Sequence, residues 1–224
     1  MAGEVRIYLG DEAGIGDAAS FVLTGAVAGA RFGFSVAWAG DLNADGYADL
    51  AVGAPDTAGA GGMQVGSAFV FYGSPGGPSA APDATLVGIN SGGGFFGHSV
   101  AGMGDGNGDG YDELAVGAFG VNSRTGRVSV FLGGAAGLVT TTRTNVEGPF
   151  GANGDFGWSL ASAGDVDANG RDDLVVGSPG VDDRTGRAHV FRGATAGGVS
   201  MTPLVDLLGA SGGSFGRAVA TVGR

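Results

Sequence analysis

The sequence predicts an all-β fold, a β-propeller with four-stranded antiparallel blades, from three observations. First, Phe-Gly pairs recur at Phe32, Phe96, Phe156 and Phe215, which are separated by 64, 60 and 59 residues. Second, the short segments between these pairs alternate apolar and polar residues, as half-buried strands do. Third, the 50 glycines follow the same period, so they mark turns and not low-complexity sequence. A period of about sixty residues fits a blade, whereas a β-solenoid normally has shorter rungs.

Four strands are predicted in the first full repeat. The strand over 32–39 leads into an acidic loop, and the strand over 50–53 leaves that loop as an apolar run suited to burial. The third strand is predicted over 66–72 and the outer, fourth strand over 84–87. Such a unit, repeated radially about an axis, makes the blades of a propeller.

Partial repeats are predicted at both ends of the chain. Residues 1–31 match the second half of a repeat, with strands over 3–8 and 20–24, and residues 215–223 match a first strand. Because open propellers leave unpaired strand edges, three arrangements remain open: closure of the two ends into a fourth blade, head-to-tail association of two chains, or a piece of a longer propeller. The expected divisions of the single propeller domain are 1–31, 32–95, 96–155, 156–214 and 215–224.

The loop DLNADGYAD, residues 41–49, predicts a calcium site. Oxygen-bearing side chains stand at its first, third, fifth and ninth positions, and Gly46 at the sixth permits a sharp turn. Ca²⁺ takes roughly six to eight oxygen ligands at about 2.3–2.6 Å, and alternate residues of a tightly wound loop can supply them. One such run alone is typical of a surface turn. Here it occurs three times, which favours calcium.

The predicted ligands occupy equivalent positions in the three loops. Side chains would bind from positions one, three, five and nine, and a backbone carbonyl from position seven. They are Asp41, Asn43, Asp45, Tyr47 and Asp49; Asp105, Asn107, Asp109, Tyr111 and Glu113; and Asp165, Asp167, Asn169, Arg171 and Asp173. About three Ca²⁺ per chain are therefore predicted. Glu113 is one methylene longer than Asp, but Glu can serve as a bidentate ligand.

The charge of the chain is concentrated in these loops. Its net charge is −11, and the windows 41–49, 105–113 and 165–173 hold eleven of the 22 acidic residues. Three bound Ca²⁺ would add six charges and bring −11 to −5, so removal of the metal should leave carboxylate clusters that repel one another. Stability is therefore expected to depend on calcium. The negative charge also argues against nucleic acid and anionic membrane surfaces as partners.

Composition bounds the location of the protein. The chain has no cysteine, which excludes disulfides and thiolate metal sites. The chain has no run of about eighteen apolar residues, so no membrane insertion is predicted. Its opening, MAGEVRIYLG, lacks the basic and apolar regions of a signal peptide. Calcium sites of modest affinity fill where calcium is abundant, so an extracellular or periplasmic location is expected, with any leader lost or upstream.

No catalytic set of residues is recognisable, and we expect a protein that is not an enzyme. His98 and His189 are the only histidines, and each is expected in a strand as a packed or half-exposed side chain. No G-x-S-x-G motif is present. The glycines from Gly102 onward superficially resemble a phosphate loop, but Asp105 and Asp109 would repel an anion.

Two further features each allow a second interpretation. Trp38 and Trp158 could be sugar-stacking platforms, but both fall in expected first strands, and core packing is favoured, as it is for Met103. The near copies RTGR at 124–127 and 184–187 could be basic ligand-binding pairs. A turn with Gly at its tight position explains them as well and is favoured.

The repeat, with FG at its start, the D-x-[DN]-x-[DN]-G-x-x-[DE] loop and GAP at its end, resembles the FG-GAP repeat of integrin α-subunit β-propellers and their bacterial relatives. The match covers 32–224 and part of 1–31; the closing tripeptide departs at 117–119, GAF, and 177–179, GSP, where local turn geometry is affected. The resemblance implies seven blades, more than one copy of this chain can form. It also implies adhesion, matrix contact or carbohydrate binding. The expected partner is thus a protein or carbohydrate ligand. The alternative is a purely structural propeller fragment that assembles through its open ends into a larger ring, and this association is weighed against simple truncation of a longer propeller.

Overall fold

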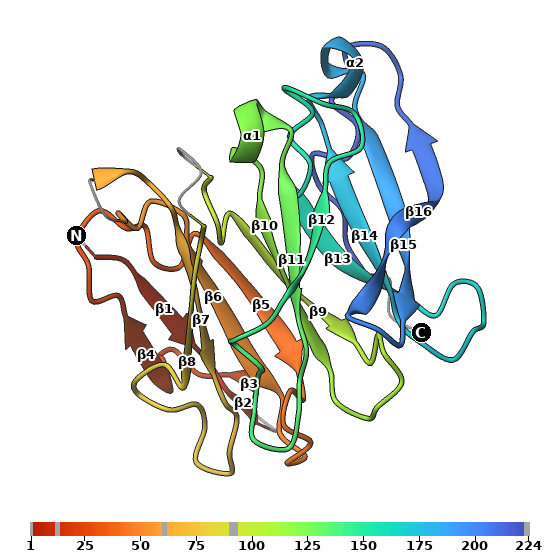
Figure 1. Ribbon diagram of the computed structural model, residues 1–224. Helices are drawn as coiled ribbons and strands as arrows, with labels where there is room; N and C mark the ends of the chain where they lie inside the picture. The colour runs from red at the N-terminus through yellow and green to blue at the C-terminus, as the bar shows by residue number, and fades with distance from the viewer. Residues whose placement is uncertain (1, 12–13, 60–61, 90–93, 222–224) are drawn as a thin grey trace.

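The computed structural model describes residues 2–11, 14–59, 62–89 and 94–221. Three four-stranded antiparallel sheets stand side by side in it, each with its strands in chain order (Figure 1). The predicted all-β fold built from propeller blades is confirmed. In the described part of the chain, no helix is long and apolar enough to cross a bilayer.

The three complete blades share one plan, in which a first strand pairs with a second, the second with a third and the third with a fourth. The first strand begins at Ser35, three residues later than predicted, because Gly33 (φ 84°) turns the chain before it. The blades contain β5 (Ser35–Gly40), β6 (Asp49–Ala54), β7 (Ser67–Phe71) and β8 (Ala84–Val87); β9 (Ser99–Gly104), β10 (Glu113–Ala118), β11 (Arg127–Phe131) and β12 (Thr144–Glu147); and β13 (Ser159–Gly164), β14 (Asp173–Ser178), β15 (Arg187–Ala194) and β16 (Gly198–Leu208).

The N-terminal segment forms a smaller sheet beside the first blade. Strands β1 (Glu4–Ile7) and β4 (Phe21–Thr24) pair antiparallel, as expected for this segment. Between them, β2 (Gly10–Asp11) pairs with β3 (Gly14–Ile15), a contact that the sequence pattern did not predict.

Residues 215–221 do not form the first strand that was predicted over 215–223, so this prediction is wrong for the described residues. Phe215 makes one isolated bridge, to Gly186, and the Thr221 hydroxyl donates a hydrogen bond to the Ser162 carbonyl at 2.8 Å. Strands β5, β9 and β13 are each held by pairing with the strand that follows, and 215–221 has no such partner among the described residues. The remaining predicted positions, 222 and 223, lie outside the described residues.

The core lies within and between the blades. All six residues of β6 and of β10 are buried, and Met103 is fully buried as predicted. Phe96, Phe156 and Phe215 each form a bridge to the glycine just before the third strand of the preceding blade. A Cβ on Gly126 would lie 2.1 Å from the Phe156 carbonyl oxygen, so this close approach requires glycine. The FG pairs therefore join neighbouring blades.

Antiparallel pairing sends the two kinds of connection to opposite ends of the blades (Figure 1). The acidic loops join first to second strands, and the turns α1 (Val121–Arg124) and α2 (Val181–Arg184) join second to third strands at the other end. The predicted turns are present, but α1 is not a right-handed helix. Asn122, Ser123 and Arg124 have φ of 53°, 57° and 64°, so it is a single left-handed turn.

Candidate metal centre

The ninth residue of each acidic loop anchors the predicted ligand set. Asp49, Glu113 and Asp173 are the first residues of β6, β10 and β14, and all three are fully buried. In the first loop Asp49 pairs across the sheet with Gly40, the residue just before Asp41. Strand pairing thus brings positions one and nine of the loop together.

The first ligand of each loop fixes how the loop winds. Its carboxylate accepts hydrogen bonds from the backbone N–H groups of positions five and six, at 3.0 and 2.8 Å for Asp41. The same pairs of bonds occur at Asp105 (3.1 and 2.9 Å) and at Asp165 (2.9 and 2.8 Å). The chain is left-handed at position six, where Gly46 has φ 89°, and also at position four, where Ala44 has φ 54°. Sequence analysis did not predict the left-handed conformation at position four.

The ninth carboxylate is surrounded by backbone donors. Asp49 accepts hydrogen bonds from the N–H groups of Leu42 at 2.9 Å and Gly73 at 2.8 Å. Burial nevertheless raises the pKa of Asp49 and Asp173 above the ordinary range, and raises that of Glu113 to about 7. Each loop therefore holds a buried carboxylate that a nearby cation would stabilise.

Two buried oxygens test whether the loops fit a hard cation. In the described part of the chain, the buried side-chain polar atoms that lack a hydrogen-bond partner are Asn107 Oδ1 and Asp167 Oδ1. Both belong to the third position of a predicted calcium loop. An unsatisfied buried acceptor costs about 1–3 kcal/mol, and a metal ion would satisfy it. The side chains of these loops therefore fit a bound Ca²⁺ ion.

The third loop gives a second test. Carboxylate oxygens of Asp165, Asp167 and Asp173 all lie within 4.8 Å of one another. Oxygens bound on opposite sides of one Ca²⁺ would be about 5 Å apart, so these three can share an ion. The other two loops place the corresponding residues in the same winding, with Asn43 Oδ1 accepting from the N–H of Asp45 at 3.1 Å.

The seventh position is predicted to bind through its carbonyl, and that role stays a prediction. The N–H of Tyr47 donates to Asp45 Oδ1 at 2.9 Å, and that of Tyr111 donates to Asp109 Oδ1 at 3.0 Å. The side chain of Arg171 crosses to the preceding loop, where Nε donates to the Asn107 carbonyl at 3.2 Å.

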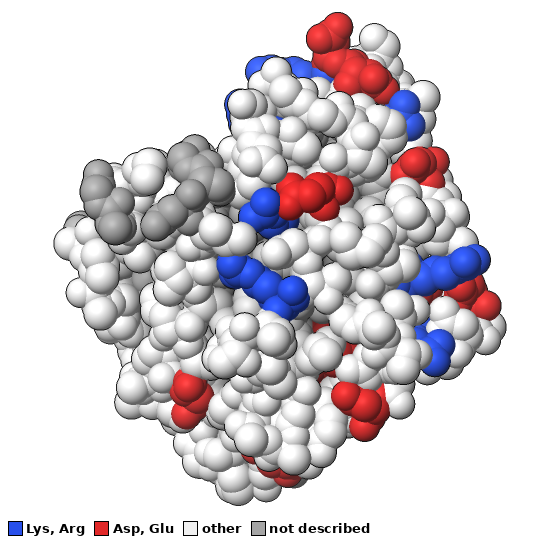
Figure 2. Space-filling model, in the orientation of Figure 1, with Lys and Arg blue, Asp and Glu red and all other residues white. Residues whose placement is uncertain are grey.

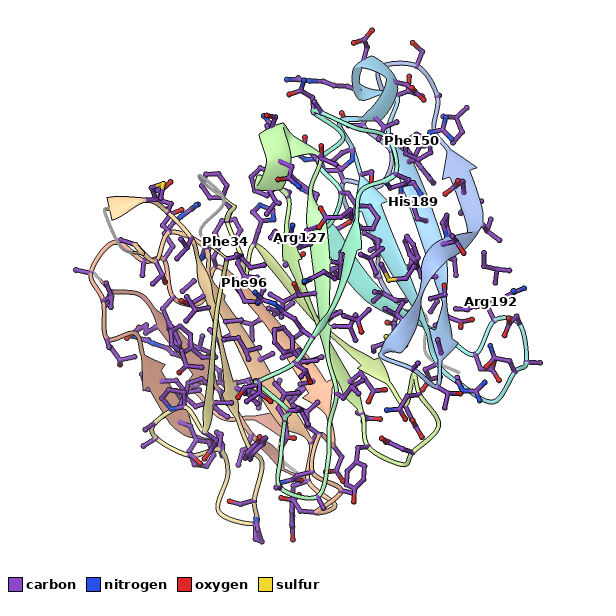
Figure 3. All side chains as sticks on the ribbon, viewed as in Figure 1. Phe34, Phe96, Arg127, Phe150, His189 and Arg192 are labelled. Atoms are coloured by element: carbon purple, nitrogen blue, oxygen red, sulfur yellow. The ribbon has the colours of Figure 1, made fainter. Side chains whose placement is uncertain are left out.

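Three charged side chains at the loops were missed by sequence analysis. Asp112 Oδ2 accepts a hydrogen bond from the Asp41 N–H at 2.7 Å, and Asp172 packs closely against Gly104. Their signal is an Asp at position eight of the second and third loops, where the first loop has Ala48. Arg192, labelled beside the third loop in Figure 3, forms an ion pair with Asp167 at 2.7 Å.

The two tryptophans occupy different environments. Trp38 is 65% exposed on β5, beside the exposed Val36, so the prediction of core packing is wrong for it. Residues of β1 line an open hollow beside Val36 and Trp38 but leave most of the Trp38 ring exposed. Trp158 is half-buried, with ring centroids 4.5 Å from His98 and 4.7 Å from Phe119, and is packed as predicted.

Both histidines are packed as expected, but only His189 lies in a strand, because β9 begins one residue after His98. His189 is fully buried; its Nδ1 lies 2.5 Å from Asp206 Oδ1 and its Nε2 lies 3.0 Å from the Ser178 hydroxyl. Its ring stacks beside Phe150, with centroids 5.5 Å apart (Figure 3). His98 is half-buried, and Nδ1 lies 3.2 Å from the Trp158 carbonyl.

A family model described as the FG-GAP repeat matches residues 32–63 and 156–191. The chain is 42% identical to human integrin alpha-IIb over 156 residues, 66% of this chain and 15% of that protein. It is 34% identical to chicken integrin alpha-V over 197 residues, 80% of this chain and 17% of that protein. A mouse phosphatidylinositol-glycan-specific phospholipase D is 37% identical over 158 residues, 67% of this chain and 18% of that protein.

These similarities cover most of the chain but a small part of each relative, because the chain spans less than a fifth of the length of each. The similarity to bacterial relatives stays a prediction. The structure and the sequence matches agree on FG-GAP repeats. The chain has three complete blades, glycine-dependent FG contacts between them, and two segments that match the family model. The chain contains FG-GAP repeats, which are similar in sequence to those of integrin α subunits.

Proposed function

We propose that the chain is a calcium-stabilised, non-catalytic propeller module that binds a protein or carbohydrate ligand. The observation that carries the calcium assignment is the pair of buried oxygens without partners, Asn107 Oδ1 and Asp167 Oδ1. Each belongs to a position that the ligand pattern names independently. About three ions per chain are proposed, one in each acidic loop.

Calcium would stabilise the blades through contacts between loops. Each ion would neutralise a buried carboxylate such as Glu113, and Asp112 links the second loop to the first. Binding at one loop would therefore order the start of the neighbouring loop as well. The proposed location is extracellular or periplasmic, where such sites would be filled.

The test counts metal ions and measures stability. Native mass spectrometry should show about three Ca²⁺ per chain, and Asp45→Ala should lose one and lower the melting temperature. Asp17→Ala, an exposed acidic residue outside the loops, is the matched control and should keep all three. An unchanged metal count in Asp45→Ala would show that the ligand assignment of the first loop is wrong.

The carbohydrate ligand rests on the exposed Trp38. It lines an apolar hollow of about 190 Å³ together with Tyr47, Phe71 and Pro78, and aromatic faces of this kind can stack on sugars. A glycan array probed with and without chelator separates the two ligand classes. Sugar-specific binding that disappears in Trp38→Ala supports a carbohydrate, and its absence leaves a protein ligand.

A second candidate is a structural propeller that assembles through its open ends. Exposed apolar residues support it at both ends: Val36 and Trp38 on β5, and Leu207 and Leu208 on β16. Static light scattering in calcium tests it, because a multiple of the chain mass is expected and a monomer contradicts it. The face in Figure 2 carries Arg in small separate groups, not in a stripe, and no nucleic-acid partner is proposed.

A further inference from the structure

A column of side chains runs across the blades at the end opposite the acidic loops. Its members stand two residues after each FG phenylalanine: Phe34, His98, Trp158 and Arg217. Ring centroids are 5.0 Å apart for Phe34 and His98 and 4.5 Å apart for His98 and Trp158. The guanidinium of Arg217 lies 5.4 Å from the Trp158 ring. The column therefore ends in a cation where the other repeats have an aromatic ring.

A second substitution occurs beside the same arginine. Arg124, in α1, forms a bidentate ion pair with Asp155, with both N–O distances 2.7 Å. Arg184 holds the equivalent position in α2, and Ser214 stands where Asp155 would be. The two repeats make the same backbone hydrogen bond at this place. The Asp155 N–H donates to the Arg124 carbonyl at 2.9 Å, and the Ser214 N–H donates to the Arg184 carbonyl at 2.7 Å. Arg184 thus has the setting of Arg124 without the carboxylate.

These residues line one polar pocket of about 200 Å³. Its charged side chains are Arg124, Asp155, Arg184 and Arg217, a net charge of +2 in a chain of net charge −11. The carboxylate of Asp155 is already paired with Arg124. Within the described residues, neither Arg184 nor Arg217 belongs to an ion pair. Two guanidinium groups therefore face a hollow with no carboxylate of their own.

We propose that this pocket binds the carboxylate side chain of an acidic peptide segment, which would take the place that Asp155 occupies in the preceding repeat. The inference rests on the ligand-binding role proposed above and names the ligand's chemistry. Guanidinium groups donate two parallel hydrogen bonds to a planar carboxylate, and such charge-assisted bonds are about twice as strong as neutral ones. Its charged lining of three arginines and one aspartate favours an anionic group over a neutral sugar.

The repeat itself supplies the decisive variant. Ser214→Asp would place a carboxylate beside Arg184, as Asp155 is placed beside Arg124. The backbone accepts it, because Asp155 has φ 56° and Ser214 has φ 49°, a region that Asp tolerates well. Ser214→Asn has nearly the same shape without the charge and is the matched control. Neither variant removes an arginine.

The experiment follows the arginine Nε–Hε NMR signals of the calcium-loaded chain during titration with acetyl-Gly-Gly-Asp-Gly-Gly-amide. The signals of Arg184 and Arg217 should shift, and the corresponding Asn peptide should leave them unmoved. Ser214→Asn should bind like the wild type, and Ser214→Asp should bind at least about tenfold more weakly, since its own carboxylate occupies the donors. Arg6, remote and exposed, reports non-specific salt effects.

Three results would overturn the proposal: equal shifts with the Asp and Asn peptides, undiminished binding by Ser214→Asp, or no shift at millimolar peptide. Sodium glucuronate provides the other arm, and binding of glucuronate without binding of the peptide would assign the pocket to acidic sugars instead. Metal count and melting temperature are measured on the same samples. A chain that keeps about three Ca²⁺ and its stability but ignores the peptide contradicts this inference alone, whereas a chain without calcium contradicts the proposed calcium-stabilised module.

Discussion

The carboxylate of Asp112, in the second acidic loop, accepts a hydrogen bond from the backbone N–H of Asp41, in the first, at 2.7 Å. The N–H of Asp112 also donates to the Asp41 carbonyl at 3.3 Å, and the N–H of Asp172 donates to the Asp105 carbonyl at 3.1 Å. Position eight of each later loop thus contacts position one of the loop before it. The three loops form a continuous series in which the conformation of one supports the next.

Asp112→Ala should weaken this series. The Asp41 N–H would lose its acceptor in a half-buried place, so the free energy of unfolding should fall by about 1–3 kcal/mol. Asp112→Asn keeps an acceptor oxygen of the same reach and should recover most of that loss. Urea unfolding in saturating calcium measures both. An alanine variant as stable as the wild type would mean that the contact contributes nothing to coupling between the loops.

Glu113→Gln should change stability in opposite directions with and without calcium. Glu113 is fully buried and already accepts a hydrogen bond from the Gly106 N–H at 2.6 Å. In chelator above pH 7, where Glu113 is mostly ionised, its charge is uncompensated, so the neutral amide should raise the melting temperature. In calcium the charge becomes a metal ligand, and the variant should be less stable than the wild type. Calorimetry in both buffers measures the difference, and a change of the same sign in both would contradict the metal role.

Arg192→Leu should strengthen calcium binding at the third loop. The Arg192 guanidinium lies 2.7 Å from Asp167 Oδ2, where it competes with the metal for negative charge. Leu132 stands at the equivalent position of the second blade, so the substitution is compatible with the fold. Because Arg192 is half exposed, the gain should be modest, up to about fivefold in affinity. Calorimetric titration resolves it, with Arg6→Leu as control; a weaker third site would mean that Arg192 orients Asp167 for binding.

The parts of the structure that sequence analysis predicted are those that a local period determines. Strand β8 alternates buried and exposed residues, and Gly46 marks a turn that a Cβ would strain, so each could be located without knowing its neighbours. The burial of Met103 was predicted from its position seven residues after Phe96, among small residues, and is confirmed.

The parts that it missed depend on contacts between repeats. Residues 215–221 have the composition of a first strand, but a strand forms only when another strand pairs with it. Trp38 is a large apolar residue in an expected strand, but it is 65% exposed because the neighbouring β1 leaves an open hollow beside it. The role of Asp112 could have been suspected from the pattern at position eight, where the second and third loops have Asp112 and Asp172 and the first has Ala48.

The two tryptophans should respond differently to removal. Trp38→Ala should change the free energy of unfolding by no more than about 0.5 kcal/mol, because the ring is 65% exposed. Trp158→Ala should cost about 1–3 kcal/mol, because its ring packs against His98 and Phe119. Each variant leaves the other tryptophan as its fluorescent probe, so red-shifted emission from Trp38 and blue-shifted emission from Trp158 check the assignment. Equal losses of stability would place both rings in the core.

Burial of His189 should make stability depend on pH. Desolvation lowers the pKa of this side chain, and the repulsion of Arg187 adds to the effect, while the hydrogen bond with Asp206 opposes it less strongly. The folded state then binds fewer protons than the unfolded state, whose histidine pKa is about 6.5. The free energy of unfolding should therefore fall as the pH drops below about 6.5, by at most about 1.4 kcal/mol per pH unit for this group.

His189→Gln isolates this effect, because glutamine can still bond with Asp206 and Ser178 but does not titrate. Burial also lowers the pKa of His98, so His98→Gln and the double variant complete the set. Unfolding free energies between about pH 5 and pH 7 in saturating calcium should show a shallower slope in each single variant than in the wild type, and the shallowest in the double variant. A wild-type slope in the double variant would assign the acid sensitivity to the carboxylates of the loops instead.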